Sequence, residues 1–189
     1  MLTMLASDFD RKDLQDDVRA ALSSTAAEVK EVLVSRNAAE SENLFETAAE
    51  MVNSAMPLLV CNMALGRASD LSIPAKAANV CERTAATLSG SIIEKDVEEM
   101  FWHRTEMELC VKAIAPLATA GAVKKHSGEY LSSSYLAEID GAIDSVVSAI
   151  EDADAEKLDA CIKEMESVLN RVQDDAIAGM ISREIGDWA

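Results

Sequence analysis

Aromatic residues are scarce in this 189-residue sequence, at 4%, and it contains only 3 Pro and 7 Gly. An all-β chain of many short strands needs frequent turn residues and favours aromatic and β-branched side chains. The apolar residues, 49% of the total, are instead mainly Ala, Leu, Val, Ile and Met, which fill helix interfaces well. No segment alternates convincingly with a period of two. The composition therefore predicts an all-α fold.

Positive charge is also in short supply, with 17 Lys and Arg against 34 Asp and Glu and a net charge of −17. Such a surface repels phosphate backbones and anionic lipids, so we expect neither a nucleic acid nor a membrane as partner. The apolar runs at residues 55–65 and 113–123 each contain a proline and fall far short of the ~20 residues that cross a bilayer. The acidity favours a solvated surface, with a salty cytoplasm or a basic protein partner as alternatives.

The four cysteines, Cys61, Cys81, Cys110 and Cys161, form no C-x-x-C pair, so the usual zinc and redox spacings are absent. The first ten residues, "MLTMLASDFD", lack the basic region and apolar stretch of an export signal. We therefore expect buried thiols in a reducing cytoplasm. A four-cysteine metal site assembled from separate helices is the alternative.

Apolar residues spaced by three and four predict the helices of the N-terminal half. A first helix is expected to begin near Asp8 or Asp10, and its stripe is Leu14, Val18, Leu22, Thr25, Val29 and Val32. A second is expected to begin after Ser41 and to stop at Gly66, with the stripe Leu44, Phe45, Ala48, Val52, Ala55 and Leu59. A third follows Pro74, and "LSGS" at 88–91 either breaks or loosens it.

A fourth helix is predicted over about residues 93–117, followed by the clearest candidate linker at 121–134. Two further stripes then span 136–150 and 158–180, and Asp154 is the expected cap between them. Helices joined by so few residues pack antiparallel. The prediction is an up-and-down antiparallel bundle of five to six helices in a single domain, 1–189, with a subdivision into 1–122 and 131–189 as the alternative.

The densest group of chemically active residues is "EEMFWHRTEMELC" at 98–110. On a helix, Glu99 and Glu106 lie four residues before and three residues after His103, on the same side. This trio could bind a divalent metal or tune a histidine that transfers protons. Glu42, Glu46 and Glu50 could add carboxylates if their helix faces this one. The competing interpretation is an ordinary histidine at the edge of the core and a solvated line of glutamates.

Established catalytic motifs are absent from the sequence. Neither histidine has the E-x-x-H spacing of di-iron bundles, H-E-x-x-H does not occur, and no phosphate-binding glycine loop or G-x-S-x-G elbow is present. An acidic helical bundle with a histidine on one helix resembles histidine-phosphotransfer domains. Members of that family place Lys and Gly just after the histidine, whereas "RTEMEL" follows His103 here.

Phe101 and Trp102 are adjacent in a sequence with few aromatic residues. They point about 100° apart on a helix, so both cannot face the same seam of the core. Because interfaces are enriched in Trp, Phe101, Trp102 and Trp188 are the candidate contacts with a partner or a second copy. The alternative is that Phe101 and Trp102 cover an edge of the bundle and that Trp188 docks on it.

These observations predict a cytoplasmic binding or regulatory protein, an adaptor or assembly subunit, that works through protein contacts and forms a homodimer. No cofactor is predicted. One alternative is a metal-dependent or redox enzyme that uses Glu99, His103 and Glu106. Another is a phosphorelay or ligand-sensing bundle centred on His103.

Overall fold

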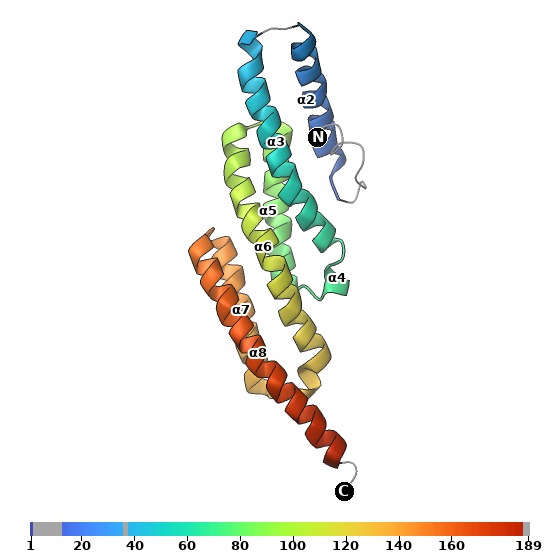
Figure 1. The fold of residues 1–189 in the computed structure, drawn as a ribbon, viewed down its shortest axis with the longest axis vertical. Coiled ribbons are helices and arrows are strands. Elements are labelled where there is room, and N and C mark those ends of the chain that lie inside the picture. The colour runs from blue at the N-terminus through green and yellow to red at the C-terminus, as the bar shows by residue number, and fades with distance from the viewer. Residues whose placement is uncertain (2–12, 36–37, 187–189) are drawn as a thin grey trace. The chain divides into compact units, whose positions relative to one another are not determined.

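The computed structural model describes residue 1 and residues 13–35 and 38–186, and these contain α-helices and no strand. The all-α prediction is therefore confirmed for this part of the chain (Figure 1). The helices are α2 (Asp16–Ser35), α3 (Ala38–Leu65), α4 (Ala68–Leu71), α5 (Ala75–Glu94), α6 (Val97–Ser127), α7 (Ser133–Glu151) and α8 (Ala155–Gly186). A short 3-10 turn, η1 (Gly128–Tyr130), separates α6 from α7.

The chain divides into two compact units that do not follow its order. Unit 1 comprises the described parts of residues 1–66 together with 81–111, and unit 2 comprises 67–80 and the described parts of 112–189. The boundaries at 80/81 and 111/112 fall inside α5 and α6, so each of these helices contributes to both units. These boundaries differ from those of the alternative subdivision into 1–122 and 131–189.

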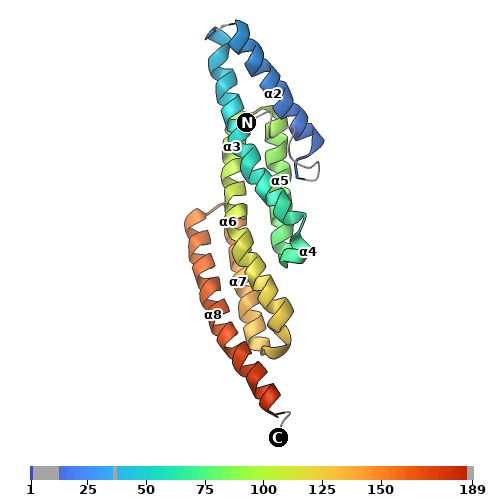
Figure 2. The same cartoon turned by 45° about the vertical axis from the view of Figure 1, so that its right-hand side comes forward.

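In unit 1, α2 and α3 run side by side (Figures 1 and 2). The predicted stripe of the first helix is confirmed for Val18, Leu22 and Thr25 of α2 and for Leu14 just before it, which are all buried. The expected start at Asp8 or Asp10 lies outside the described residues. Asp16 and Asp17 are in the first turn of α2, where negative charge suits the positive end of the helix.

Helix α3 begins earlier than the second predicted helix, and Ala48, Ala55 and Leu59 of the predicted stripe are buried. It begins at Ala38, so Ser41 is inside the helix, and it continues through Pro57 to Leu65, just before the expected stop at Gly66. Its buried side chains include Met51, Ala55, Leu58 and Leu59. Phe45, which the sequence assigned to the buried stripe, is 40% exposed.

Helices α5 and α6 are separate elements. α5 continues through "LSGS" to Glu94, so these residues do not break it. Lys95 then adopts a left-handed φ of 58°, and the side chain of Asp96 accepts a hydrogen bond from the Glu99 amide at 3.1 Å. This capping contact starts α6.

In unit 2 the helix α6 continues to Ser127 and α7 begins at Ser133, so the expected linker at 121–134 is reduced to residues 128–132. Ser132 caps α7 by accepting from the Tyr135 amide at 3.3 Å, and Asp154 caps α8 by accepting from the Lys157 amide at 2.9 Å. Helices α7 and α8 lie side by side (Figure 1). Their predicted stripes are confirmed by burial of Ile139, Ile143, Val146, Ile150, Leu158, Met165, Leu169 and Val172.

Candidate functional site

An uncovered apolar stripe runs along α3 on the side away from its buried face. Phe45, Met56, Val60 and Met63 are 40–49% exposed, and Ala49 is exposed as well. At 100° per residue the five side chains fall within a sector of about 60°. Isolated exposed apolar residues are ordinary, whereas exposed apolar residues that recur on one side of a helix over five turns form a candidate interaction surface.

The stripe continues onto α6. Phe101 and Trp102 are 48% and 59% exposed, and their rings meet edge to face with centroids 5.7 Å apart. Ala49 and Phe101 line the same shallow hollow of about 530 Å³, between α3 and the start of α6. We call this combined surface the α3–α6 face: Phe45, Ala49, Met56, Val60 and Met63 of α3 with Phe101 and Trp102 of α6.

Carboxylates border one end of the α3–α6 face. Glu46, Glu50 and Glu98 line the hollow beside Ala49 and Phe101. Of these, Glu46 and Glu98 are exposed and available to a partner. An aromatic and aliphatic surface with an acidic border complements a ligand that has apolar side chains flanked by cations.

The third carboxylate, Glu50, serves the internal structure. It accepts from Arg104 Nε at 2.7 Å, with both side chains mostly buried. Arg104 also bonds Glu108 at 2.8 Å and stands 5.3 Å from the centre of the Phe101 ring. The hydrogen bond that Arg104 donates to Glu50 is the main reason that the pKa of Arg104 is raised. Glu50 and Arg104 thus hold α3 against α6 and fix the position of Phe101.

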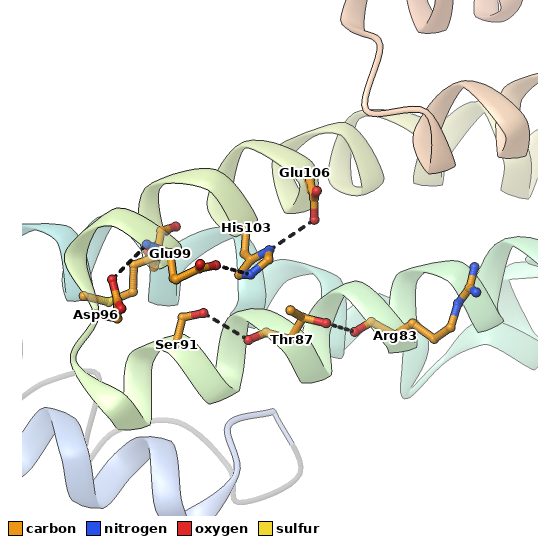
Figure 3. Close-up of polar contacts among 9 residues, drawn as sticks. Arg83, Thr87, Ser91, Asp96, Glu99, His103 and Glu106 are labelled. Atoms are coloured by element: carbon orange, nitrogen blue, oxygen red, sulfur yellow. Dashed lines mark hydrogen bonds and ion pairs between the residues drawn. The ribbon is translucent and has the colours of Figure 1, made fainter.

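The predicted trio is brought together by α6 itself. His103 Nε2 is 2.9 Å from a Glu99 oxygen and Nδ1 is 3.3 Å from a Glu106 oxygen. Figure 3 shows the ring between these two carboxylates, on the side of α6 that faces α5. Each carboxylate therefore occupies one of the two ring nitrogens that could ligate a metal.

The neighbouring groups of α5 add no ligand to this trio. The hydroxyls of Thr87 and Ser91 donate to backbone carbonyls of α5, at 3.1 Å to Arg83 and 3.3 Å to Thr87 (Figure 3). Among the described residues, no group of three or more His, Cys, Asp and Glu is arranged to hold a metal ion. A metal or proton-transfer role for His103 stays a prediction.

His103→Ala tests whether the ring acts as structure or as a reagent. The ring is only 21% exposed and makes two contacts with carboxylates, so we expect a loss of about 1 kcal/mol in the free energy of unfolding. Thermal melts would measure the loss, and metal analysis by mass spectrometry after mild chelation would accompany them. One equivalent of metal in the wild type that disappears in the variant would contradict the structural role.

Three cysteines meet inside unit 1. Cys61 of α3, Cys81 of α5 and Cys110 of α6 are buried and free, as predicted. The hydrogen bond with Cys110 favours the Cys81 thiolate, but the bond to Cys61 and burial outweigh it and raise the pKa of Cys81 to about 12. The pKa of Cys110 is raised by its contact with Cys81 and by burial. Cys81 and Cys110 remain neutral thiols at physiological pH, so they are poor nucleophiles.

Thiol titration should separate the cysteines. At pH 8 we expect Ellman's reagent to label the half-exposed Cys161 within minutes, and the other three only after denaturation. Above pH 9 the unfolded chain releases protons that folded Cys81 and Cys110 retain. The free energy of unfolding should therefore fall between pH 9 and 12, by up to about 1.4 kcal/mol per pH unit per thiol. Two or more rapidly labelled thiols would contradict this arrangement.

The remaining residues predicted for the site are Trp188 and two glutamates of α3. Trp188 lies outside the described residues, and Glu42 and Glu46 of α3 are exposed and do not join His103. Sequence reasoning missed Met56, Val60 and Met63 on the α3–α6 face. The available signal was that residues 55–65 are apolar apart from Asn62, which leaves apolar side chains uncovered on one side once the helix packs.

Comparison with known proteins places this chain in no group: no family model, no curated protein and no solved structure matches it. One helix within the described ranges, residues 41–65 of α3, is long and apolar enough to cross a membrane by length and composition. Core helices of bundles pass the same test, and 39% of its apolar window is buried.

Proposed function

We propose that this protein is a binding or regulatory subunit whose α3–α6 face captures an amphipathic helix with basic flanks from another protein. The observation that carries the proposal is the exposed apolar stripe of α3 joined to Phe101 and Trp102. Its length of five turns matches helix-in-groove recognition, in which apolar anchors recur at three and four residues. The four free cysteines favour a reducing compartment, in keeping with a cytoplasmic location.

Charge supports a basic partner over a second copy. Glu46 and Glu98 border the hollow beside Phe101, and the whole chain carries a charge of −17. Two such faces brought together would oppose like charges, whereas Lys and Arg on a partner would pair with them. An anionic lipid surface is disfavoured for the same reason.

The direct test uses a synthetic helical peptide with Leu at alternating spacings of three and four and Lys on its flanks. Fluorescence anisotropy should show binding that weakens with salt, because the flanking charges are screened. A peptide with the same leucines and Glu in place of Lys should bind at least about tenfold more weakly.

Variants of the protein locate the binding site. Val60→Glu should abolish peptide binding, because it places a charge in the middle of the apolar stripe. Ala86→Glu, at an exposed position of α5, changes the net charge equally and should leave the affinity unchanged. Equal affinities for the two variants, or equal affinities for the Lys and Glu peptides, would reject the proposal. The proposal would also be rejected if the wild type bound phosphatidylcholine vesicles but not the peptide, and Val60→Glu abolished the vesicle binding.

Self-association is the second candidate, favoured by the 59% exposure of Trp102. Under this second candidate, light scattering of the wild type would give a dimer that strengthens as salt screens the acidic borders. Trp102→Ala should weaken it about tenfold or more, since buried Trp residues dominate many interfaces. A monomer in both proteins at high concentration would remove the homodimer and leave the peptide site untouched.

A further inference from the structure

A second hollow lies entirely within unit 2 and shares no residue with the α3–α6 face. It encloses about 560 Å³ between the segment from α4 to the start of α5, the C-terminal half of α6, and α7. That volume is within the range of small-molecule sites, about 300–1,000 Å³. Ile73 and Ile143, which are 9% and 4% exposed, form apolar parts of its wall beside Pro74.

Close backbone packing forms one side of the hollow. Ser72 adopts a left-handed φ of 58°, and the Ile73 amide bonds the Ala68 carbonyl at 2.9 Å. A Cβ added to Gly121 would stand 1.8 Å from the Ser72 carbonyl oxygen. Only a glycine allows α6 to approach the segment this closely, so the wall is held by the backbone.

The polar lining is positively charged, in contrast to the chain as a whole. Lys76, Lys124 and Lys125 line the hollow together with Asp140 and Asp144. Lys76 pairs with Asp144 at 2.8 Å, and Lys124 pairs with Asp140.

Those two ion pairs tie α5 and α6 to α7 and leave the third lysine uncompensated. Lys125 is exposed and forms no ion pair with any residue that the structure describes. The three lysines and two aspartates sum to one positive charge at the mouth of a partly apolar hollow.

We propose that this hollow binds a small organic anion, an apolar body that carries one acidic group. The body contacts Ile73, Pro74 and Ile143, and the acidic group meets Lys125. Acid groups are favoured over cations because both aspartates are already paired with lysines. The site is independent of the proposed peptide-binding face.

The test uses 8-anilinonaphthalene-1-sulfonate as the probe, with N-phenyl-1-naphthylamine as the same ring system without the acid. We expect saturable fluorescence enhancement with the sulfonate at one site and at least about tenfold weaker binding of the uncharged compound. Val60→Glu should not change this binding, which separates the hollow from the α3–α6 face.

Two variants and a control locate the bound probe. Ala75→Trp fills the hollow at an exposed lining position, and Lys125→Glu reverses the unpaired charge. Each should weaken the sulfonate about tenfold or more. Lys163→Glu, at an exposed position of α8, alters the net charge equally and should have no effect.

Circular dichroism establishes that each variant folds, and Lys125→Gln replaces Lys125→Glu if that variant does not. Unchanged affinity in either Ala75→Trp or the Lys125 variant overturns the proposal, as does equal binding of the charged and uncharged compounds.

Discussion

Gly121→Ala is expected to lower the free energy of unfolding by about 2–3 kcal/mol, although alanine favours a helix over glycine by about 1 kcal/mol. The new Cβ would be 1.8 Å from the Ser72 carbonyl oxygen and 3.0 Å from its carbonyl carbon. Both are backbone atoms, so no side-chain rotation relieves the clash. Either α6 or the segment before α5 must move by roughly 1 Å or more, which breaks contacts around Ile73.

Thermal melts of a matched pair of variants would measure this effect. Gly141 of α7 has no atom within 4 Å of an added Cβ, so Gly141→Ala should stabilise the protein by up to about 1 kcal/mol. For a chain of this size, each kcal/mol shifts Tm by roughly 2–4 °C. The two variants should therefore move Tm in opposite directions. A Gly121→Ala protein as stable as Gly141→Ala would show that α6 and Ser72 do not approach closely.

Arg104→Met is expected to cost about 2–3 kcal/mol, the second large effect, because it leaves a mostly buried carboxylate without its cation. The Glu50 side chain is only 13% exposed and its bond to Arg104 is 2.7 Å long. Without Arg104, Glu50 keeps the 3.4 Å contact from Ser54 Oγ in a desolvated position. The methionine recovers part of the lost packing but none of the lost charge.

A double-mutant cycle separates the pair from its surroundings. Adding Glu50→Gln to Arg104→Met should restore much of the lost stability, because the unpaired charge is then removed. Arg171→Met is the control: Arg171 bonds Glu138 at 3.2 Å with its side chain 63% exposed. Such a surface pair should change stability by less than about 0.5 kcal/mol. Additive losses in the cycle would mean that Glu50 and Arg104 do not act together.

The hairpin of α7 and α8 was predictable because its information is local. Ile139, Ile143, Val146 and Ile150 recur at helical spacing and are buried on one side of α7. Asp154 was predictable as a cap because few other side chains satisfy the free amides at a helix start. Burial and capping here depend on neighbours within a few residues.

The face of α3 and the length of α6 were not predictable from local patterns. Apart from Asn62, residues 55–65 of α3 are apolar, so periodicity does not decide between Leu58, which is buried, and Val60, which is 45% exposed. The sequence around Gly121 favours a linker because glycine often ends helices. The actual reason for this glycine is the approach of Ser72, some fifty residues earlier in the chain.

Among the site residues, contacts within one helix were likewise predictable, whereas contacts between helices were not. The contacts of Glu99 and Glu106 with His103 follow from spacing along a single helix. The pairing of Glu50 with Arg104 joins two helices and depends on how α3 and α6 pack. The meeting of Cys61, Cys81 and Cys110 depends on three helices at once. Each further helix adds a packing choice that spacing alone does not contain.

Helices α5 and α6 each contribute to both units, which limits how the protein can be divided into fragments. The polypeptide changes unit three times, after residues 66, 80 and 111. No single cut releases either half intact, and a fragment that ends at residue 122 would retain pieces of both. A truncated or recombined variant would therefore have to keep α5 and α6 whole to retain both units.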